Sequence, residues 1–168
     1  KRELVSIIIR TKNEERWISA CLQGIFSQTY KDFEIIIVDN FSTDKTLKKA
    51  KQFKIKKILK IKKFLPGKAI NIGIKNSKGK YAVILSAHAI PTNKLWLEKL
   101  VSAIREDENF AGVYGRQEPM TFSSPSDKRD MLLVFGLDRK YQTKDSFFHN
   151  ANSIIKKEVW NKIPFDNK

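Results

Sequence analysis

Short apolar runs recur along the chain and are separated by segments with a different spacing of apolar residues. Three clear runs cover residues 4–10, 33–39 and 81–85, and a weaker run has isoleucine at every third position over 55–61. A short run at 110–115 follows. Continuous apolar runs of this length are typical of strands buried on both faces. The pattern therefore predicts five strands.

The segments between the runs have apolar residues three or four positions apart, which indicates amphipathic helices. Ser42 to Asp44 and Asn93 are candidate caps for two of them. The expected helices cover roughly 13–28, 45–53, 66–77 and 95–105. Alternating strands and helices predict an α/β fold with a mainly parallel sheet and helices on both faces. Ligands of such sheets bind beyond the carboxyl ends of the strands.

Length and composition limit the class of protein. The 168 residues, 41% of them hydrophobic, fit one folded domain over 1–168 and exclude general disorder. No apolar run approaches the roughly 18 residues of a membrane span, and no leader-like segment is present, so we expect a cytoplasmic protein. The single cysteine, Cys21, excludes a disulfide scaffold and falls on the apolar face of a predicted helix, which indicates a core position.

The charge is strongly positive and uneven. Lysine and arginine number 33 against 18 acidic residues, giving +15, and residues 45–63 hold ten lysines without an acid. This stretch is interpreted as a solvated face, with peripheral attraction to an anionic membrane surface as the alternative. It contains no arginine and only Phe53 as an aromatic residue, so it fits nucleic-acid binding poorly.

Polar residues at the predicted strand ends are the candidates for chemistry. Asp39 directly follows four apolar strand residues, where its carboxylate could accept a hydrogen bond from a base or ribose. Asp44 could bind a ligand or cap the next helix. Lys68 follows Pro66-Gly67, where a helix N-terminus could face a diphosphate, although an ordinary turn explains the same residues.

Common catalytic motifs are missing from the sequence. There is no Walker phosphate loop, no Gly-x-Gly-x-x-Gly and no Gly-x-Ser-x-Gly, which argues against nucleotidases, dinucleotide oxidoreductases and serine hydrolases. His88 lies at the end of a predicted strand and could bind a metal, although a hydrogen-bonded structural histidine is the commoner case. Arg10 and Arg116, also at strand ends, could bind phosphate or pair with a neighbouring acid.

Several segments, taken in order, resemble family 2 glycosyltransferases of the GT-A fold. They are VSIIIRTKNEE (5–15), the CL and Q of CLQGIFSQTY (21–30), FEIIIVDNFSTDKT (33–46), GKAINIGIKNSKGKYAVILSAHAIP (67–91) and WLEKL (96–100). The later segments GRQEPM (115–120) and FFHNANSIIKKEVWNKIPFD (147–166) look like the family's acceptor-side region. The resemblance covers nearly the whole chain, and its specificity comes from the order of the motifs.

The resemblance implies roles for individual residues. Thr11, Glu14 and Asp39 would contact the nucleoside of a sugar nucleotide, and Asp44 would support the second loop. Asn71 matches the first position of the family's Asn-x-Gly on the diphosphate side. Together with Arg10 and Lys68, which their positions in the sequence single out, these residues form the predicted nucleotide-sugar-binding set. Arg116, Glu118 and Asn150 are the acceptor-side candidates.

The sequence departs from the family at the metal motif. Ser86-Ala87-His88 stands where the family has Asp-x-Asp, which suggests a subgroup. His88 occupies the position of a metal-facing carboxylate, so we expect it to bind Mn²⁺ or Mg²⁺ with the diphosphate and water completing the shell. Arg10 replaces a usual proline, and Ile70 stands where many members have arginine.

Inverting members of the family use an Asp or Glu general base, commonly in a Glu-Asp pair after the segment that here reads IPFDNK. No such pair follows Phe165, and Glu106-Asp107 lies in the wrong place. We therefore expect the base, and the rest of the acceptor region, to lie beyond Lys168.

The leading functional hypothesis is an inverting glycosyltransferase that transfers a sugar from a nucleotide-sugar donor to a saccharide or lipid-linked acceptor, in bacterial surface polysaccharide synthesis. The alternative is a non-catalytic module that binds nucleotide sugars or polyanions. A nucleic-acid-binding protein acting through residues 45–63 is a third class, which would show a steep salt dependence.

Overall fold

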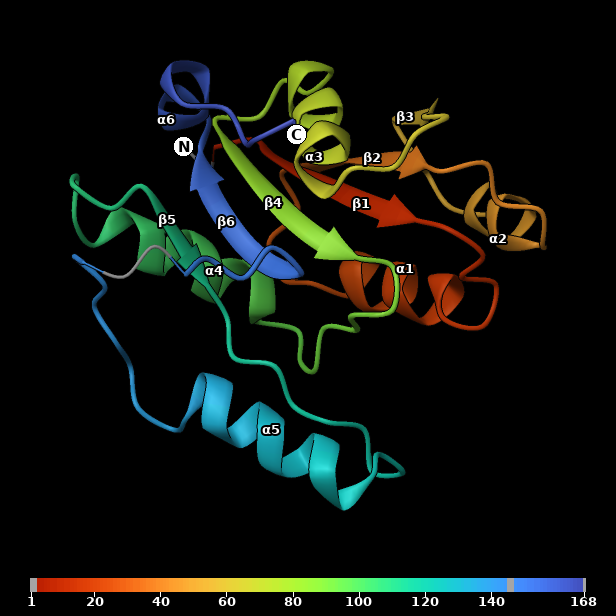
Figure 1. The fold of residues 1–168 in the computed structure, drawn as a ribbon. Coiled ribbons are helices and arrows are strands. Elements are labelled where there is room, and N and C mark those ends of the chain that lie inside the picture. Colours follow the sequence, from red (N-terminus) through yellow and green to blue (C-terminus); the bar gives the residue numbers. More distant parts are fainter. Residues whose placement is uncertain (1–2, 145–146, 168) are drawn as a thin grey trace.

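A computed structural model describes residues 3–144 and 147–167, and a twisted six-stranded sheet forms its centre (Figure 1). The strand order across the sheet is β3-β2-β1-β4-β6-β5. The strands are β1 (Val5–Thr11), β2 (Phe33–Asp39), β3 (Lys57–Lys60), β4 (Tyr81–Ser86), β5 (Gly112–Tyr114) and β6 (Asn152–Lys156).

The first four strands along the chain are parallel neighbours, as the alternation of strands and helices predicts. β3 lies at one edge, which agrees with its weaker apolar pattern. β6 was not among the predicted strands, and it pairs antiparallel with both β4 and β5. It inserts between these two strands and brings residues near 150 to the end of β4.

Helices cover both faces of the sheet, as predicted (Figure 1). On one face the buried side chains of α1 (Ile18–Phe26) and α4 (Trp96–Arg105) form one core cluster with the sheet, together with Ala50 of α2 (Thr46–Ala50). Cys21 is part of this cluster, and burial raises its pKa to about 12. On the other face, α3 (Pro66–Lys75) and α6 (Lys157–Lys162) contribute to a second cluster.

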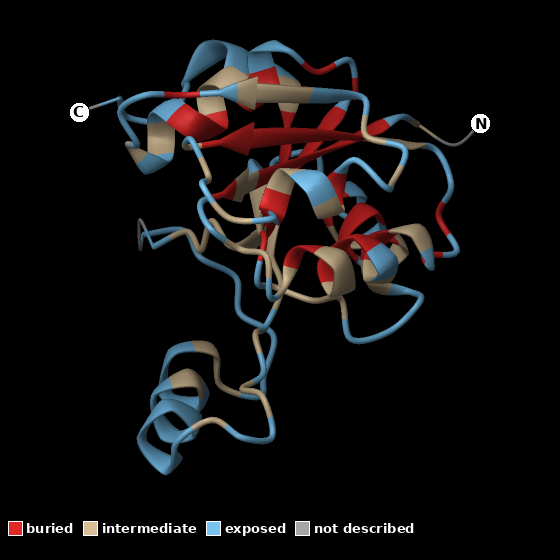
Figure 2. Cartoon of the chain, turned by 90° about the vertical axis from the view of Figure 1, so that its right-hand side faces the viewer, coloured by how far each residue is buried: buried red, intermediate tan, exposed pale blue. Residues whose placement is uncertain are grey.

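The helix α5 (Pro125–Phe135) projects away from this body (Figures 1 and 2). None of its residues is buried, and Leu133 is 71% exposed. Ring contacts are made just before α5 and at its last residue: Phe122 stacks on Trp17, and Phe135 packs edge-on against His149.

Two predicted helices begin later or end earlier than expected. α1 begins at Ile18 rather than near residue 13, because Asn13 has a left-handed φ of 53° and residues 15–17 form a turn. α2 covers only Thr46–Ala50 of the expected 45–53.

Among the residues that the structure describes, no helix has both the length and the apolar character needed to cross a bilayer.

Candidate functional site

Thr11 and Asp39 lie side by side where β1 and β2 end, because they are direct partners in the parallel register. The Asp39 side chain is buried and accepts hydrogen bonds from the backbone N–H of Ser42 at 3.0 Å and from its hydroxyl. The Thr11 hydroxyl is buried and has no hydrogen-bond partner in the described chain. Thr11 and Asp39 therefore lie next to each other, and the Thr11 hydroxyl could still form a hydrogen bond to a ligand.

Hydrogen bonds join the loop after β1 to the loop after β2. The left-handed Asn13 donates its N–H to the hydroxyl of Ser42 at 2.9 Å, and its Oδ1 accepts from the N–H of Thr43 at 2.8 Å. Asparagine tolerates this backbone conformation better than most residues, and its short amide can bond to nearby backbone. The two loops consequently form one unit over the strand ends.

Asp44 connects the same two loops through its carboxylate. Oδ2 accepts the N–H of Glu15 at 3.0 Å, while Oδ1 accepts the N–H of Thr46 at 2.9 Å and its hydroxyl. Burial disfavours the charge on Asp44, but the hydrogen bonds from Thr46 and Glu15 outweigh burial, so the pKa of this carboxyl is lowered. The contacts of Asp44 are structural, at the start of α2.

Glu14 and His88 meet across the loops that follow β1 and β4. Oε1 of Glu14 lies 2.9 Å from Nδ1 of His88, and the two side chains are 21% and 59% exposed. If Nδ1 carries the proton, Nε2 of His88 keeps a lone pair directed away from Glu14. The sequence offered no sign of this contact between residues 74 positions apart.

Glu14 and His88 could supply only part of the ligand set of a metal ion. The described part of the chain has no group of three or more His, Cys, Asp or Glu side chains able to hold an ion. Glu14 and His88 supply at most two ligands, so diphosphate oxygens and water would have to provide the others. The pair therefore fits an ion that is bound jointly by the protein and the diphosphate of a nucleotide.

Arg10 and Asn150, predicted for the donor and acceptor sides, also come together. Nη2 of Arg10 donates to the backbone carbonyl of Asn150 at 2.7 Å and to its Oδ1 at 3.2 Å, and lies 3.4 Å from the hydroxyl of Ser86. Burial lowers the pKa of Arg10. The other strand-end arginine candidate, Arg116, is exposed and lies 3.8 Å from Glu118, apart from these contacts.

The structure places Asn71 away from the strand-end loops. Its Oδ1 accepts from the indole of Trp160 at 2.7 Å and from the N–H of Phe165 at 3.0 Å, while its Nδ2 donates to the carbonyl of Phe165 and to Asn167. All the bonding capacity of its amide serves residues 160–167. Lys68 is exposed and lines a hollow of about 460 Å³ beside Asn71 and Trp160. Diphosphate contacts by Lys68 and Asn71 stay predictions.

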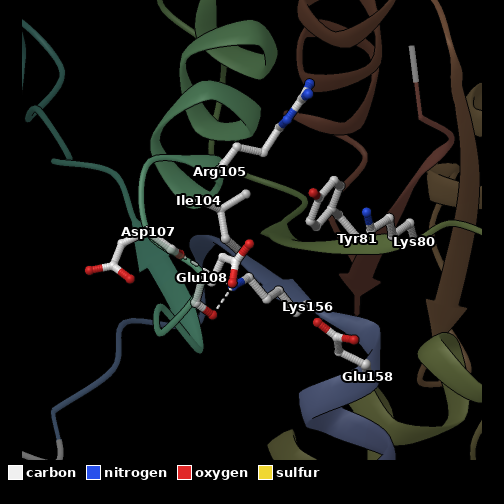
Figure 3. A pocket seen from close by; sticks show the side chains of 8 residues that line it. All are labelled: Lys80, Tyr81, Ile104, Arg105, Asp107, Glu108, Lys156 and Glu158. Carbon is white, nitrogen blue, oxygen red and sulfur yellow. Dashed lines mark hydrogen bonds between the residues drawn. The ribbon is translucent and has the colours of Figure 1, made fainter. Parts of the chain in front are cut away.

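Another hollow, of about 410 Å³, lies at the opposite edge of the sheet, where β4 begins and β6 ends (Figure 3). Its charged side chains have mixed signs. The ammonium of Lys156 donates to the backbone carbonyls of Asp107 and Glu108, so this charge already has partners. The hollow shares no residue with the strand-end loops.

Comparison with known proteins agrees with the resemblance seen in the sequence. A family model described as glycosyl transferase family 2 matches residues 6–163. A dolichyl N-acetyl-alpha-D-glucosaminyl phosphate 3-beta-D-2,3-diacetamido-2,3-dideoxy-beta-D-glucuronosyltransferase from Methanococcus voltae is 39% identical, with coverage of 88% of this chain and 50% of that protein. A UDP-Glc:alpha-D-GlcNAc-diphosphoundecaprenol beta-1,3-glucosyltransferase from Escherichia coli is 31% identical, covering 73% and 55%.

A solved structure shares the fold. The mannosyltransferase from Pyrobaculum calidifontis, in complex with GDP-Man and Mn²⁺, superimposes with a TM-score of 0.75 at 20% identity and covers 98% of this chain and 48% of its own. The likeness confirms the predicted GT-A architecture. The chain spans about half the length of the curated relatives described above. Because the family model covers most of its residues, the chain belongs to glycosyl transferase family 2.

Proposed function

We propose that this chain is the nucleotide-sugar-binding part of an inverting glycosyltransferase that acts on a saccharide or lipid-linked hydroxyl in surface polysaccharide synthesis. One observation carries the proposal: Thr11, Asp39 and the Glu14–His88 pair come from three strand ends and gather at one edge of the sheet. Ligands of parallel sheets bind at that edge. The names of the relatives, which describe transfer to lipid-linked sugars, support the acceptor class.

The nucleoside would lie over Thr11 and Asp39. Asp39 is buried beneath its own hydrogen bonds to Ser42, so a base can reach its carboxylate only if the Ser42 hydroxyl turns away. The unpaired hydroxyl of Thr11 would then gain a partner. Asp44 and Asn13 would hold the surrounding loops in place without touching the ligand.

We propose that His88 binds Mn²⁺ or Mg²⁺ at the diphosphate and that Glu14 orients its imidazole. Imidazole suits manganese better than magnesium, which prefers oxygen ligands. The bound ion would act as a Lewis acid toward the departing diphosphate. Glu14 would keep Nε2 of His88 available by accepting the proton of Nδ1.

The general base stays unassigned within the chain. Glu106 and Asp107 form a Glu-Asp pair, but they follow α4 at the edge of the sheet away from the strand-end loops. Glu106 pairs with Arg139, and Asp107 accepts from the N–H of Asn109 at 2.8 Å. We propose that the base belongs to the acceptor region of the longer enzyme.

The decisive experiment is a titration of this chain with UDP, GDP, CMP and dTDP sugars, with and without Mn²⁺. One class of nucleotide should bind at least tenfold more tightly than the others. A transfer assay on the longer protein then separates the enzyme from a non-catalytic module, because only the enzyme converts bound donor. No selective binding of any nucleotide would overturn the proposal.

We also propose peripheral contact with an anionic membrane. The lysines of residues 45–63 are largely exposed, and α5 presents Leu132 and Leu133 to solvent at 52% and 71%. Basic residues near anionic lipid and exposed apolar side chains both favour such a surface. Sedimentation with vesicles of phosphatidylcholine alone or mixed with phosphatidylglycerol tests this. Only the anionic vesicles should bind the protein, and 0.5 M salt should weaken that binding.

A further inference from the structure

The end of β1 carries a cation without a counter-ion. The Arg10 side chain is partly buried, and none of the ion pairs of the described residues includes it. Its Nη2 contacts only the uncharged groups of Ser86 and Asn150. Its Nε is shielded from solvent and makes no hydrogen bond within the described chain.

An unneutralised buried charge is costly, because desolvation of the cation is not offset by a carboxylate. His149 lies close enough for the charge of Arg10 to affect it. Burial and the Arg10 charge both lower the pKa of His149, which favours a neutral imidazole. The surroundings of Arg10 therefore hold polar acceptors but no negative charge, and an anion supplied from outside would offset the cost.

The position of Arg10 separates it from the nucleoside side. Side chains alternate between the two faces of a strand, and Ile9 packs in the α1 cluster whereas Ile8 packs in the α3 cluster. Arg10 consequently points to the face opposite Thr11. Its guanidinium reaches toward the end of β4 and the start of β6, whereas Asp39 lies on the other side of β1.

We propose that Arg10 binds an anionic group at the sugar end of the site, either a carboxylate on the transferred sugar or a phosphate on the acceptor. The inference rests on the proposed function, since it takes the nucleoside to lie over Thr11 and Asp39. Carboxylate and phosphate share the chemistry that matters, because a guanidinium can donate charge-assisted hydrogen bonds to either group.

The donor arm of the test compares two sugar nucleotides that differ only in a carboxylate. Calorimetry would measure binding of UDP-glucose and UDP-glucuronate to the wild-type chain, Arg10→Gln and Arg10→Lys, with GDP-mannose and GDP-mannuronate as the parallel pair. The wild type should prefer the uronate by about tenfold or more, as expected for a charge-assisted hydrogen bond. Arg10→Gln should lose this preference, and Arg10→Lys should retain part of it.

The acceptor arm uses N-acetylglucosamine 1-phosphate and the methyl glycoside of N-acetylglucosamine, each titrated in the presence of UDP. Preference for the phosphate in the wild type, lost in Arg10→Gln, would assign Arg10 to the acceptor. A preference in either arm supports the proposal and identifies the source of the anion. A wild type that prefers the anionic member in neither arm, or an Arg10→Gln variant that keeps the preference, overturns it.

Two further readouts distinguish the proposal from a purely structural role of Arg10, and its failure from a failure of the proposed function. A purely structural Arg10 predicts unchanged selectivity in a folded Arg10→Gln, because the selectivity then depends on other residues. If Arg10→Gln weakens plain UDP as much as every sugar nucleotide, Arg10 serves the diphosphate and the inference is wrong. If no nucleotide binds the wild type, the proposed function fails, whereas the phosphate arm still reports on Arg10. Wild-type selectivity decides the matter if Arg10→Gln does not fold.

Discussion

Glu14 and His88 meet through a 2.9 Å contact between Oε1 and Nδ1, although 74 positions separate them in the chain. Each belongs to a loop at the end of a different parallel strand. A carboxylate that accepts the proton of one ring nitrogen fixes the tautomer and leaves the other nitrogen as a ligand. This pair therefore offers a specific test of metal use at a site without the Asp-x-Asp carboxylates.

His88→Ala should abolish any strengthening of nucleotide-sugar binding by Mn²⁺, and Glu14→Gln should reduce metal affinity by about 10–100-fold, as loss of an orienting partner does. Calorimetric titrations with and without Mn²⁺ measure both effects. Lys94→Ala, at an exposed position, is the control. Equal Mn²⁺ dependence in His88→Ala and the wild type would remove His88 from the metal site.

Asp39→Ala should weaken nucleotide binding by about 1–3 kcal/mol, the expected loss for a buried charged hydrogen bond. It should also lower stability, because the N–H and hydroxyl of Ser42 lose their acceptor. Ser42→Ala removes only the hydroxyl that covers the Asp39 carboxylate, so it should not weaken nucleotide binding. Unchanged calorimetric affinity in a folded Asp39→Ala variant would contradict the nucleoside assignment.

Thr11→Val should have opposite effects on folding and binding. The Thr11 hydroxyl is buried and unpaired, so its replacement by a methyl group of similar shape should raise the free energy of unfolding by about 1 kcal/mol. The same change should weaken nucleotide binding if the hydroxyl contacts the nucleoside. Urea denaturation and calorimetry measure the two effects. A loss of stability would mean that the hydroxyl is paired in solution.

The parallel part of the fold could be predicted from the sequence because β1, β2 and β4 are continuous apolar runs and each crossover requires a helix. Phe33–Asp39 was predicted with its observed bounds. β6 was missed as a strand, although Ser153-Ile154-Ile155 is apolar enough, because its pairing depends on insertion between β4 and β5. Strand order of this kind depends on distant contacts.

The candidate site was predictable only in part. The sequence places Thr11 and Asp39 at strand ends, and the parallel register brings them together. The partners of His88 and Arg10 could not be read from local patterns, because Glu14 and Asn150 reach them through loop conformation. Asn71 shows the reverse case, since the structure gives this motif residue a contact with residues 160–167 that the motif did not suggest.

Gly73→Ala should destabilise the fold by about 1–3 kcal/mol through overpacking. A Cβ at Gly73 would lie 2.2 Å from Cγ2 of Ile8 and 3.2 Å from Cγ2 of Val38, so α3 could not keep its distance from the sheet. Gly24→Ala is a matched helical control, because its nearest neighbour is the Pro91 ring at 3.0 Å. Alanine's helix preference should offset that contact. Equal stabilities in urea would contradict the close packing of α3.

The lowered pKa of Asp44 predicts how the stability of the fold depends on pH. Its pKa is lowered in the folded protein from an ordinary value of 3.8, so its hydrogen bonds to Thr46 and Glu15 stabilise the fold fully above that value. The contribution is lost as pH falls through the lowered pKa, where the carboxyl takes up a proton. Wild type should therefore exceed Asp44→Asn in unfolding free energy at pH 7, and the difference should shrink below about pH 4.

Urea denaturation of both proteins from pH 7 to pH 3 measures this difference in unfolding free energy. The exposed Asp138→Asn is the control, and its difference from the wild type should not shrink in the same way. A gap between wild type and Asp44→Asn that stays constant over this range would mean that the carboxylate charge does not hold the two loops together.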